Sequence, residues 1–197
     1  MNTIWADREG VHDAIADPDQ AVAWLRAVGP RLTPSAPAVG AWLDAERPAG
    51  AGETAARLRD LRNALRRLAA EATEDPRPDA QSAIATRDAA LAALNEACSA
   101  TPVWTTLHWP SGGDPTRIVR TGDLAGQAVV AMLAGQAVDV FTGDMRAQLR
   151  GYLAPGCVLY FVKQHPRREW CSAGCGNRAR VARHYQRHRA TRTNPES

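Results

Sequence analysis

The sequence has no run that approaches the ~20 consecutive apolar residues of a membrane-spanning helix. Residues 1–5 also lack the charged head and apolar core of a secretory signal. The sequence pattern therefore does not match that of an integral membrane protein or of a secreted protein. We therefore predict a soluble, cytoplasmic protein that makes no membrane contact.

Motifs for the common catalytic chemistries are also missing. The chain contains no Gly-rich phosphate loop, no Gly-x-Ser-x-Gly elbow and no internal repeat. His108 has no cysteine or carboxylate nearby at a spacing typical of metal ligation or nucleophilic catalysis, so we interpret it as a structural or surface histidine. We expect a binding protein and not an enzyme.

Lysine is almost absent, since Lys163 is the only one among 24 basic residues. The clustering of arginine is therefore more informative than its number. From residue 151 to the end there are nine basic residues and two acidic ones, a net charge of +7, whereas the first 150 residues carry a net charge of −4. This split predicts a basic binding tail on a mildly acidic body.

The first 150 residues predict a mainly α-helical domain. Asp17-Pro18 is a typical helix start, and Leu58, Leu61, Leu65 and Leu68 recur at helical spacing. We interpret the arginines between these leucines, which include Arg62 and Arg66, as the solvated faces of that helix. Helices are expected over residues 18–29, from about residue 35, and over 53–74, 80–97 and 124–141.

A β-hairpin is expected between the last two of these helices. Residues 103–109 and 116–120 are rich in β-branched and aromatic side chains, and strong turn chemistry separates them. Asp123 then precedes an apolar segment, and we expect it to cap the central core helix.

Only four cysteines are present, and three of them lie in the last 41 residues. Clustered cysteines in a cytoplasmic chain indicate metal binding more than disulfides. Cys171 and Cys175 form a Cys-x3-Cys turn, and Cys157 precedes a strand predicted over residues 158–162. This pattern predicts a structural zinc site. Cys98 lies far from the others, and we interpret it as a buried apolar residue.

Zinc in a structural site requires a fourth ligand. His165 is one candidate. His184 and His188 also follow the cysteines, but on a helix His184 would stand roughly 13 Å along the axis from Cys175, too far to share a metal.

Residues 170–178, Trp-Cys-Ser-Ala-Gly-Cys-Gly-Asn-Arg, and the arginine-rich segment after them resemble the CGNR zinc-finger family. The segments 155–161 and 167–170 are similar to that family too, and Asn2-Thr3 and the helix around residues 58–68 resemble the ABATE domain, which precedes the finger in these bacterial proteins. The resemblance implies a stress-induced transcription regulator that uses structural zinc and binds DNA.

Two features depart from the family pattern. Members usually carry a further cysteine where this chain has Tyr152, and a phenol is a poorer zinc ligand than a thiolate. His165, the residue at the Tyr152 position and water thus stay open as the fourth ligand. Members also begin with an apolar strand before Asn-Thr, so the start at Met1 suggests truncation or a misassigned start.

An arginine-rich helix is expected from residue 177 to 189. Arg180, Arg183 and Arg187 share one face, which suits contact with phosphates, and Val181 belongs to a second face that we expect to pack on the zinc core. The predicted nucleic-acid-binding residues are Arg167, Arg168, Arg178, Arg180, Arg183 and Arg187.

The predicted fold is mainly α, with a helical domain containing a β-hairpin over residues 1–148, a zinc finger (short strand, Cys-x3-Cys turn, basic helix) over 149–192 and a disordered tail over 193–197. The predicted partner is DNA. A small-molecule effector or a homodimer contact is expected at the N-terminal domain. The alternative is a zinc-stabilised protein-interaction module that does not bind DNA.

Overall fold

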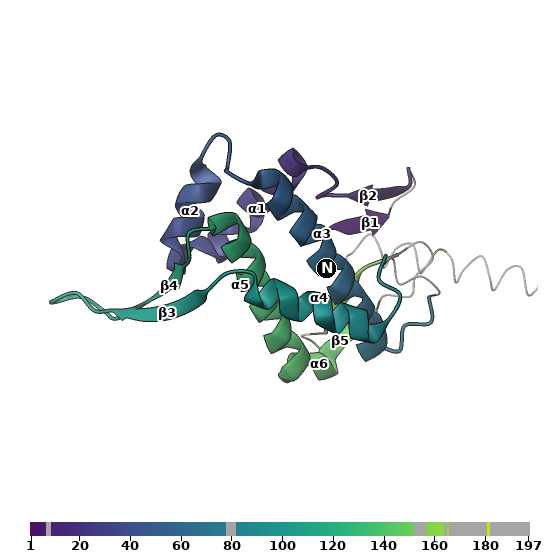
Figure 1. The fold of residues 1–197 in the computed structure, drawn as a ribbon. Helices are drawn as coiled ribbons and strands as arrows, with labels where there is room; N and C mark the ends of the chain where they lie inside the picture. Colours follow the sequence, from purple (N-terminus) through teal and green to yellow (C-terminus); the bar gives the residue numbers. More distant parts are fainter. Residues whose placement is uncertain (7–8, 78–81, 152–156, 164, 166–180, 182–197) are drawn as a thin grey trace, which may run out of the picture.

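The computed structural model describes residues 1–6, 9–77, 82–151, 157–163, 165 and 181 (Figure 1). The mainly α fold predicted for the chain is confirmed. Its helices are α1 (Pro18–Val28), α2 (Pro37–Asp44), α3 (Ala51–Ala72), α4 (Arg87–Ser99), α5 (Ala125–Thr142) and the short α6 (Met145–Gln148), with 3-10 turns η1 (Gly29–Arg31) and η2 (Thr33–Ser35) between α1 and α2.

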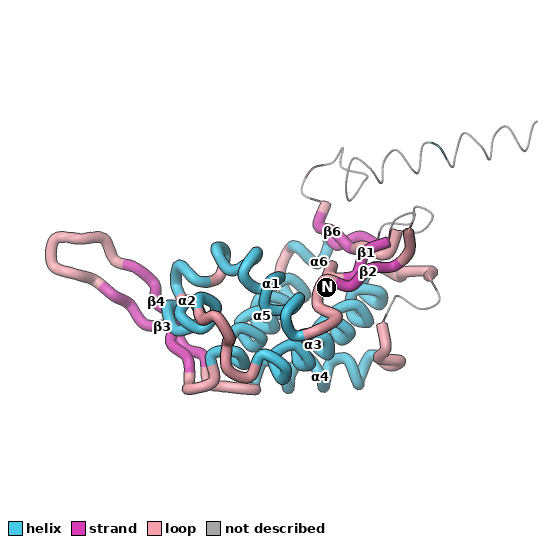
Figure 2. The backbone as a smooth tube through the Cα atoms, turned by 90° about the horizontal axis from the view of Figure 1, so that it is seen from above, coloured by secondary structure: helices cyan, strands magenta, loops and turns pink. Residues whose placement is uncertain are grey.

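The described strands form three separate antiparallel pairs. These are β1 (Ile4–Ala6) with β2 (Val11–Asp13), β3 (Val103–His108) with β4 (Thr116–Thr121), and β5 (Leu149–Gly151) with β6 (Tyr160–Val162). The predicted hairpin is β3–β4, in which Thr105 lies opposite Val119. It projects from the helices (Figures 1 and 2) and leaves large apolar side chains exposed, among them Leu107 at 70% and Trp109 at 67%.

Local capping chemistry explains where two helices begin. The Asp17 carboxylate accepts a hydrogen bond from the Gln20 amide (2.9 Å), and Pro18 stands in the first turn of α1. The Thr86 hydroxyl accepts from the Ala89 amide (3.2 Å). Because Thr86 is extended and caps the helix, α4 starts at Arg87 and not near residue 80 as the sequence predicted.

The predicted cap of α5 is wrong. Leu124 occupies the N-cap position, and no side chain caps the helix there. Asp123 stands one residue too early, so its carboxylate is not in the position from which a side chain reaches the second or third helical amide.

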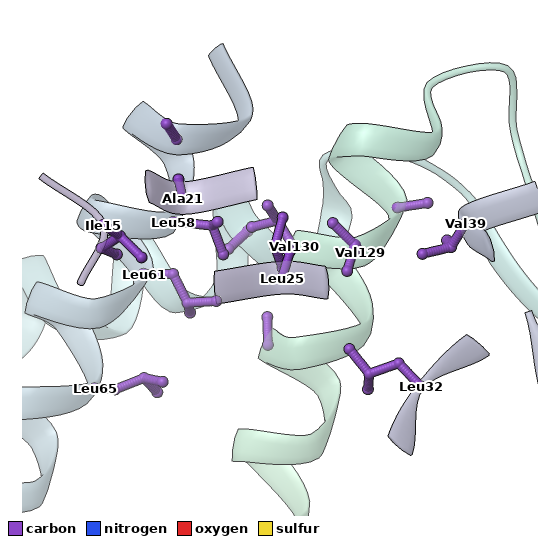
Figure 3. Packing of buried hydrophobic residues seen from close by; sticks show 14 of the residues in the cluster. Ile15, Ala21, Leu25, Leu32, Val39, Leu58, Leu61, Leu65, Val129 and Val130 are labelled. Carbon is purple, nitrogen blue, oxygen red and sulfur yellow. The ribbon is translucent and has the colours of Figure 1, made fainter. Parts of the chain in front are cut away.

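The core lies where α3 and α5 meet α1, α2 and α4 (Figure 3). Leu58, Leu61, Leu65 and Leu68 of α3 are all at most 8% exposed, as the helical spacing predicted. Val129 and Val130 of α5 are fully buried. By length and composition alone α5 could span a membrane, but the same properties are found in core helices, and α5 contacts α2, α3 and α4.

Gly126 permits the close approach of α5 to its neighbours. A β-carbon at this position would overlap Thr54 Oγ1 and lie 3.0 Å from Trp42 Cζ2. Gly135, on the same helix, has open space where a β-carbon would be. The two glycines therefore separate the packing effect of a methyl group from its effect on helix propensity.

We predict that Gly126→Ala lowers the free energy of unfolding by about 1–3 kcal/mol, because overpacking outweighs the gain in helix propensity. Gly135→Ala should raise it by up to about 1 kcal/mol, because that site has room for the methyl group. Urea denaturation followed by circular dichroism measures both. Equal effects of the two substitutions would contradict the tight contact at Gly126.

Candidate metal centre

Cys157 is the one predicted zinc ligand among the described residues, since Cys171 and Cys175 lie outside them. It precedes β6 and is 4% exposed. β6 pairs with β5, which comes before Cys157 in the chain, and Arg150 of β5 lies opposite Phe161 of β6. The predicted strand over residues 158–162 is confirmed in its second half, because β6 begins at Tyr160. Cys157 is thus held next to a strand pair that packs on the helical body.

Tyr160 connects this hairpin to the beginning of the chain. Its amide donates to Asn2 Oδ1 (3.1 Å), and its carbonyl accepts from Asn2 Nδ2 (2.6 Å). The residue is 1% exposed and clusters with Ala69, Ala70 and Leu149. The Asn2 side chain therefore satisfies both main-chain polar groups of Tyr160, as a neighbouring strand would.

The Tyr160 hydroxyl reaches the segment that follows α3. It donates to Asp75 Oδ2 at 2.7 Å, and the Asp75 side chain has no exposed surface. Burial and the hydrogen bond to Asp75 raise the pKa of Tyr160 to about 12. Burial alone would raise the pKa of Asp75, but hydrogen bonds from Arg77 and Tyr160 outweigh it and lower that pKa. Asp75 is therefore an ionised carboxylate inside a hydrogen-bonded network.

Arg77 links this carboxylate to the predicted metal ligand. It forms an ion pair with Asp75, and its Nη1 donates to the carbonyl of Cys157 at 2.7 Å. Burial would lower the pKa of Arg77, but the hydrogen bond and charge of Asp75 raise it, and the charge of Cys157 adds to this effect. Arg77 thus fixes the backbone at Cys157 and places a positive charge near this residue.

Arg66 of α3 completes the network and is 0% exposed. Its Nη2 donates to the Val158 carbonyl (2.6 Å) and its Nη1 to the Met1 carbonyl (3.1 Å). Its guanidinium carbon lies 5.4 Å from the centre of the Tyr160 ring, and that of Arg77 lies 5.1 Å from it. Both distances suit cation–π attraction. Burial lowers the pKa of Arg66.

The expectation that the arginines of α3 form solvated faces is wrong for Arg62 and Arg66. Arg62 is 8% exposed and pairs with Asp13 of β2 (2.6 Å). The β1–β2 hairpin and the segment before β6 cover this side of α3 and supply the partners. A signal was present in the sequence: Arg57 and Arg67 have glutamates four residues away, whereas Arg62 and Arg66 have no acidic residue at that spacing.

The surroundings of Cys157 fit a zinc-bound thiolate. The residue is buried, a cation lies nearby, and its carbonyl is fixed by Arg77. His165, the candidate fourth ligand, is exposed. Within the described part of the chain no three His, Cys, Asp or Glu residues come together, and Tyr152 lies outside that part. Cys98 packs against the core of the helical body but is only partly buried, so the expectation of a buried residue is met in part.

The predicted nucleic-acid surface lies outside the described residues, since its six positions are Arg167, Arg168, Arg178, Arg180, Arg183 and Arg187. Val181 is described and helical and is 54% exposed, and Cys171 and Cys175 of the zinc core on which it was expected to pack lie outside the described residues. Helical periodicity determines which residues share a face but not which element covers that face.

We predict that Arg66→Met lowers the free energy of unfolding by about 3 kcal/mol, because it leaves the buried carbonyls of Val158 and Met1 without their donor. Arg57→Met is the matched control on the same helix. Its partly exposed pair with Glu53 should change stability by less than about 1 kcal/mol. Equal losses in urea denaturation would show that the buried contacts of Arg66 contribute nothing beyond those of a surface arginine.

Comparison with known proteins places these elements in two families. Residues 1–144 match the family model ABATE, described as "Putative stress-induced transcription regulator", and residues 153–188 match the model CGNR zinc finger. No curated protein matches the chain. The hairpin strand β5 lies between the two matched ranges, and its partner β6 lies inside the second. Because the first match covers most of its length, the chain belongs to the ABATE family and carries a CGNR zinc finger after that domain.

Proposed function

We propose that this protein is a bacterial, cytoplasmic, DNA-binding transcription regulator that uses a structural zinc finger and an arginine-rich helix. The observation that carries the proposal is the joining of a regulator-family domain to a zinc finger that lies in the basic segment 151–197, whose net charge is +7. Arginine clusters of this kind suit phosphate contact, and guanidinium groups can also bind guanine edges in the major groove. The proposed role is binding and not catalysis.

The zinc would be held by Cys157, Cys171 and Cys175, with His165, the residue at the Tyr152 position or water as the fourth ligand. When bound, the ion supplies folding free energy to a module that has little core of its own. The chain's own contribution is the anchor of Cys157: Arg77 holds its carbonyl, and Arg66 holds that of the next residue.

This anchor supports a regulatory role because it joins the finger to the ABATE domain. The hydrogen bonds of Asn2, Arg66, Asp75 and Arg77 all reach residues 157–160. A change in the packing of α3 or of the first residues would therefore shift residues 157–160 at the base of the finger. The proposed DNA-contacting residues are Arg167, Arg168, Arg178, Arg180, Arg183 and Arg187.

A protein-interaction module without DNA binding is the second candidate. The β3–β4 hairpin favours it, because the hairpin projects from the body and exposes Trp104 (49%), Leu107 and Trp109. Exposed aromatic side chains are typical of protein contacts. A homodimer through the N-terminal domain belongs to this candidate, and sedimentation of the zinc-loaded protein at several concentrations would detect it.

We predict that the purified protein contains about one zinc ion per chain and that the double variant Cys171→Ser, Cys175→Ser loses it. The variant should also lose DNA binding, because a zinc finger without metal does not fold. Elemental analysis and fluorescence anisotropy on a labelled duplex at low salt measure the two properties. Cys98→Ser is the matched control and should retain both. Retention of metal by the double variant would refute the proposed ligands.

We also predict that DNA affinity falls steeply with salt, because each arginine–phosphate contact releases a counterion. The variant Arg183→Gln, Arg187→Gln should reduce the slope of log K against log salt by about two and retain zinc. Arg47→Gln, Arg87→Gln removes the same charge from exposed positions of the body and should leave the slope unchanged. Zinc-loaded protein without affinity for DNA at low salt would favour the interaction module.

A further inference from the structure

A cavity of about 210 Å³ lies between α1, α3 and α5 and is open to the first residues of the chain. Its walls are mainly apolar and include Trp24, Leu133 and Val140. Figure 3 labels Ile15, Leu58, Leu61 and Leu65, which also line it. The polar side chains in the lining include those of Thr3, Arg62 and Gln136, and Met1 also carries the α-amino group of the chain. A mainly apolar cavity with a few polar groups has the lining typical of small-molecule sites, and its volume limits the ligand to a small one.

Arg62 gives this cavity a specific chemistry. Its side chain is 8% exposed, and its Nε is buried without a hydrogen-bond partner. Its Nη1 is occupied by Asp13 (2.6 Å) and lies 3.4 Å from the hydroxyl of Thr3. A buried donor without an acceptor costs free energy. Arg62 also lines the cavity, so an acceptor that approached its side chain from there would recover part of that cost.

The charges around Arg62 favour a negative acceptor. Asp13 offsets one positive charge, but Arg66 lies one turn further along α3 and is fully buried. The charge of Arg62 is one of the causes that lower the pKa of Arg66, so the two guanidinium groups repel each other. An anion near Arg62 would relieve this repulsion, and a carboxylate is the group that matches a guanidinium in shape.

We propose that this cavity binds a small monocarboxylate with an apolar body about the size of a benzene ring, with its carboxylate next to the Arg62 side chain that lines it. The size follows from the volume, because an apolar cavity of about 150 Å³ holds benzene and this one has space for an added carboxylate. The apolar body packs against the leucines of α3 and against Leu133 and Ala137 of α5.

The position of the cavity connects its ligand to the zinc finger. Met1 and Thr3 both line it, and Asn2 between them holds both main-chain groups of Tyr160. The Met1 carbonyl accepts from Arg66, whose other bond holds Val158. A ligand that orders the first three residues therefore acts on the strand next to Cys157. That this tunes DNA binding rests on the function proposed above.

The test uses the full-length, zinc-loaded protein and titrates it with benzoate and with hexanoate in a calorimeter. Benzyl alcohol and 1-hexanol are the neutral controls of matched shape. We expect saturable binding of at least one carboxylate, and binding of its alcohol at least about tenfold weaker because the alcohol lacks the charge. If neither carboxylate saturates, or if alcohol and carboxylate bind equally, the proposal is overturned.

Two variants locate the site. Ala137→Leu fills the cavity from α5 without removing a polar contact, and we expect it to weaken carboxylate binding at least about tenfold. Ala147→Leu makes the same change at an exposed position of α6 and should bind as the wild type does. Wild-type affinity in Ala137→Leu would overturn the proposal. Arg62→Met, where it folds, should bind the alcohol and the carboxylate equally.

The experiments test the carboxylate site and its effect on DNA binding separately. Carboxylate binding is measured without DNA, so a protein that binds benzoate but no duplex retains the site and loses the function proposed above. If DNA binds, a saturating carboxylate should change the affinity of the wild type for DNA and leave that of Ala137→Leu unchanged. An equal effect on both proteins would overturn the link between the cavity and the finger.

Discussion

A guanidinium without access to solvent lies where the ABATE domain meets its zinc finger, and the rest of this junction depends on satisfying it. Burying an isolated charge is very costly, so Arg66 needs partners that remain in place. These are the carbonyls of Val158 and Met1 and the ring of Tyr160. They come from segments far apart along the chain, and all of them meet at Arg66 of α3. The first residues, α3 and the segment leading into β6 therefore form one cooperative unit.

The same logic explains the neighbouring ionic groups. Asp75 stays ionised because Arg77 and Tyr160 both donate to it, and Arg77 in turn fixes the backbone at Cys157. Removing one member leaves another buried and unpaired, and the loss in such networks exceeds what the pairwise contacts suggest. The base of the finger is thus held by polar contacts with the ABATE domain.

Much of the fold could be predicted from sequence because its signals are local. Leucines at helical spacing located α3, Asp17-Pro18 located the start of α1, and turn residues between two β-rich runs located the β3–β4 hairpin. The late start of α4 and the missing cap of α5 each depend on which of a few polar residues stands at the N-cap. Sequence alone does not settle that choice.

The sequence predicts ligands for the candidate metal site, and these stay a prediction, but it did not predict the residues that hold Cys157 in place. A Cys-x3-Cys turn and a preceding cysteine point to a metal from spacing alone. The buried roles of Arg62, Arg66 and Asn2 were missed because their partners lie 49, 92 and 158 residues away along the chain. Helical periodicity placed the arginines on faces away from the leucines, and we therefore predicted that these faces contact solvent. The β1–β2 hairpin and the segment before β6 take that place.

Strand β5 lies before the matched finger segment and its partner β6 lies inside it. This arrangement restricts how a finger can be moved from one ABATE protein to another. A graft of residues 153–188 onto another scaffold would separate β6 from β5 and from Asn2, Asp75 and Arg77. A transplanted finger would need a host that offers the same acceptors and donors. Exchange of fingers between relatives should therefore succeed only where the recipient retains the matching asparagine, aspartate and arginines, so that the two parts are inherited together.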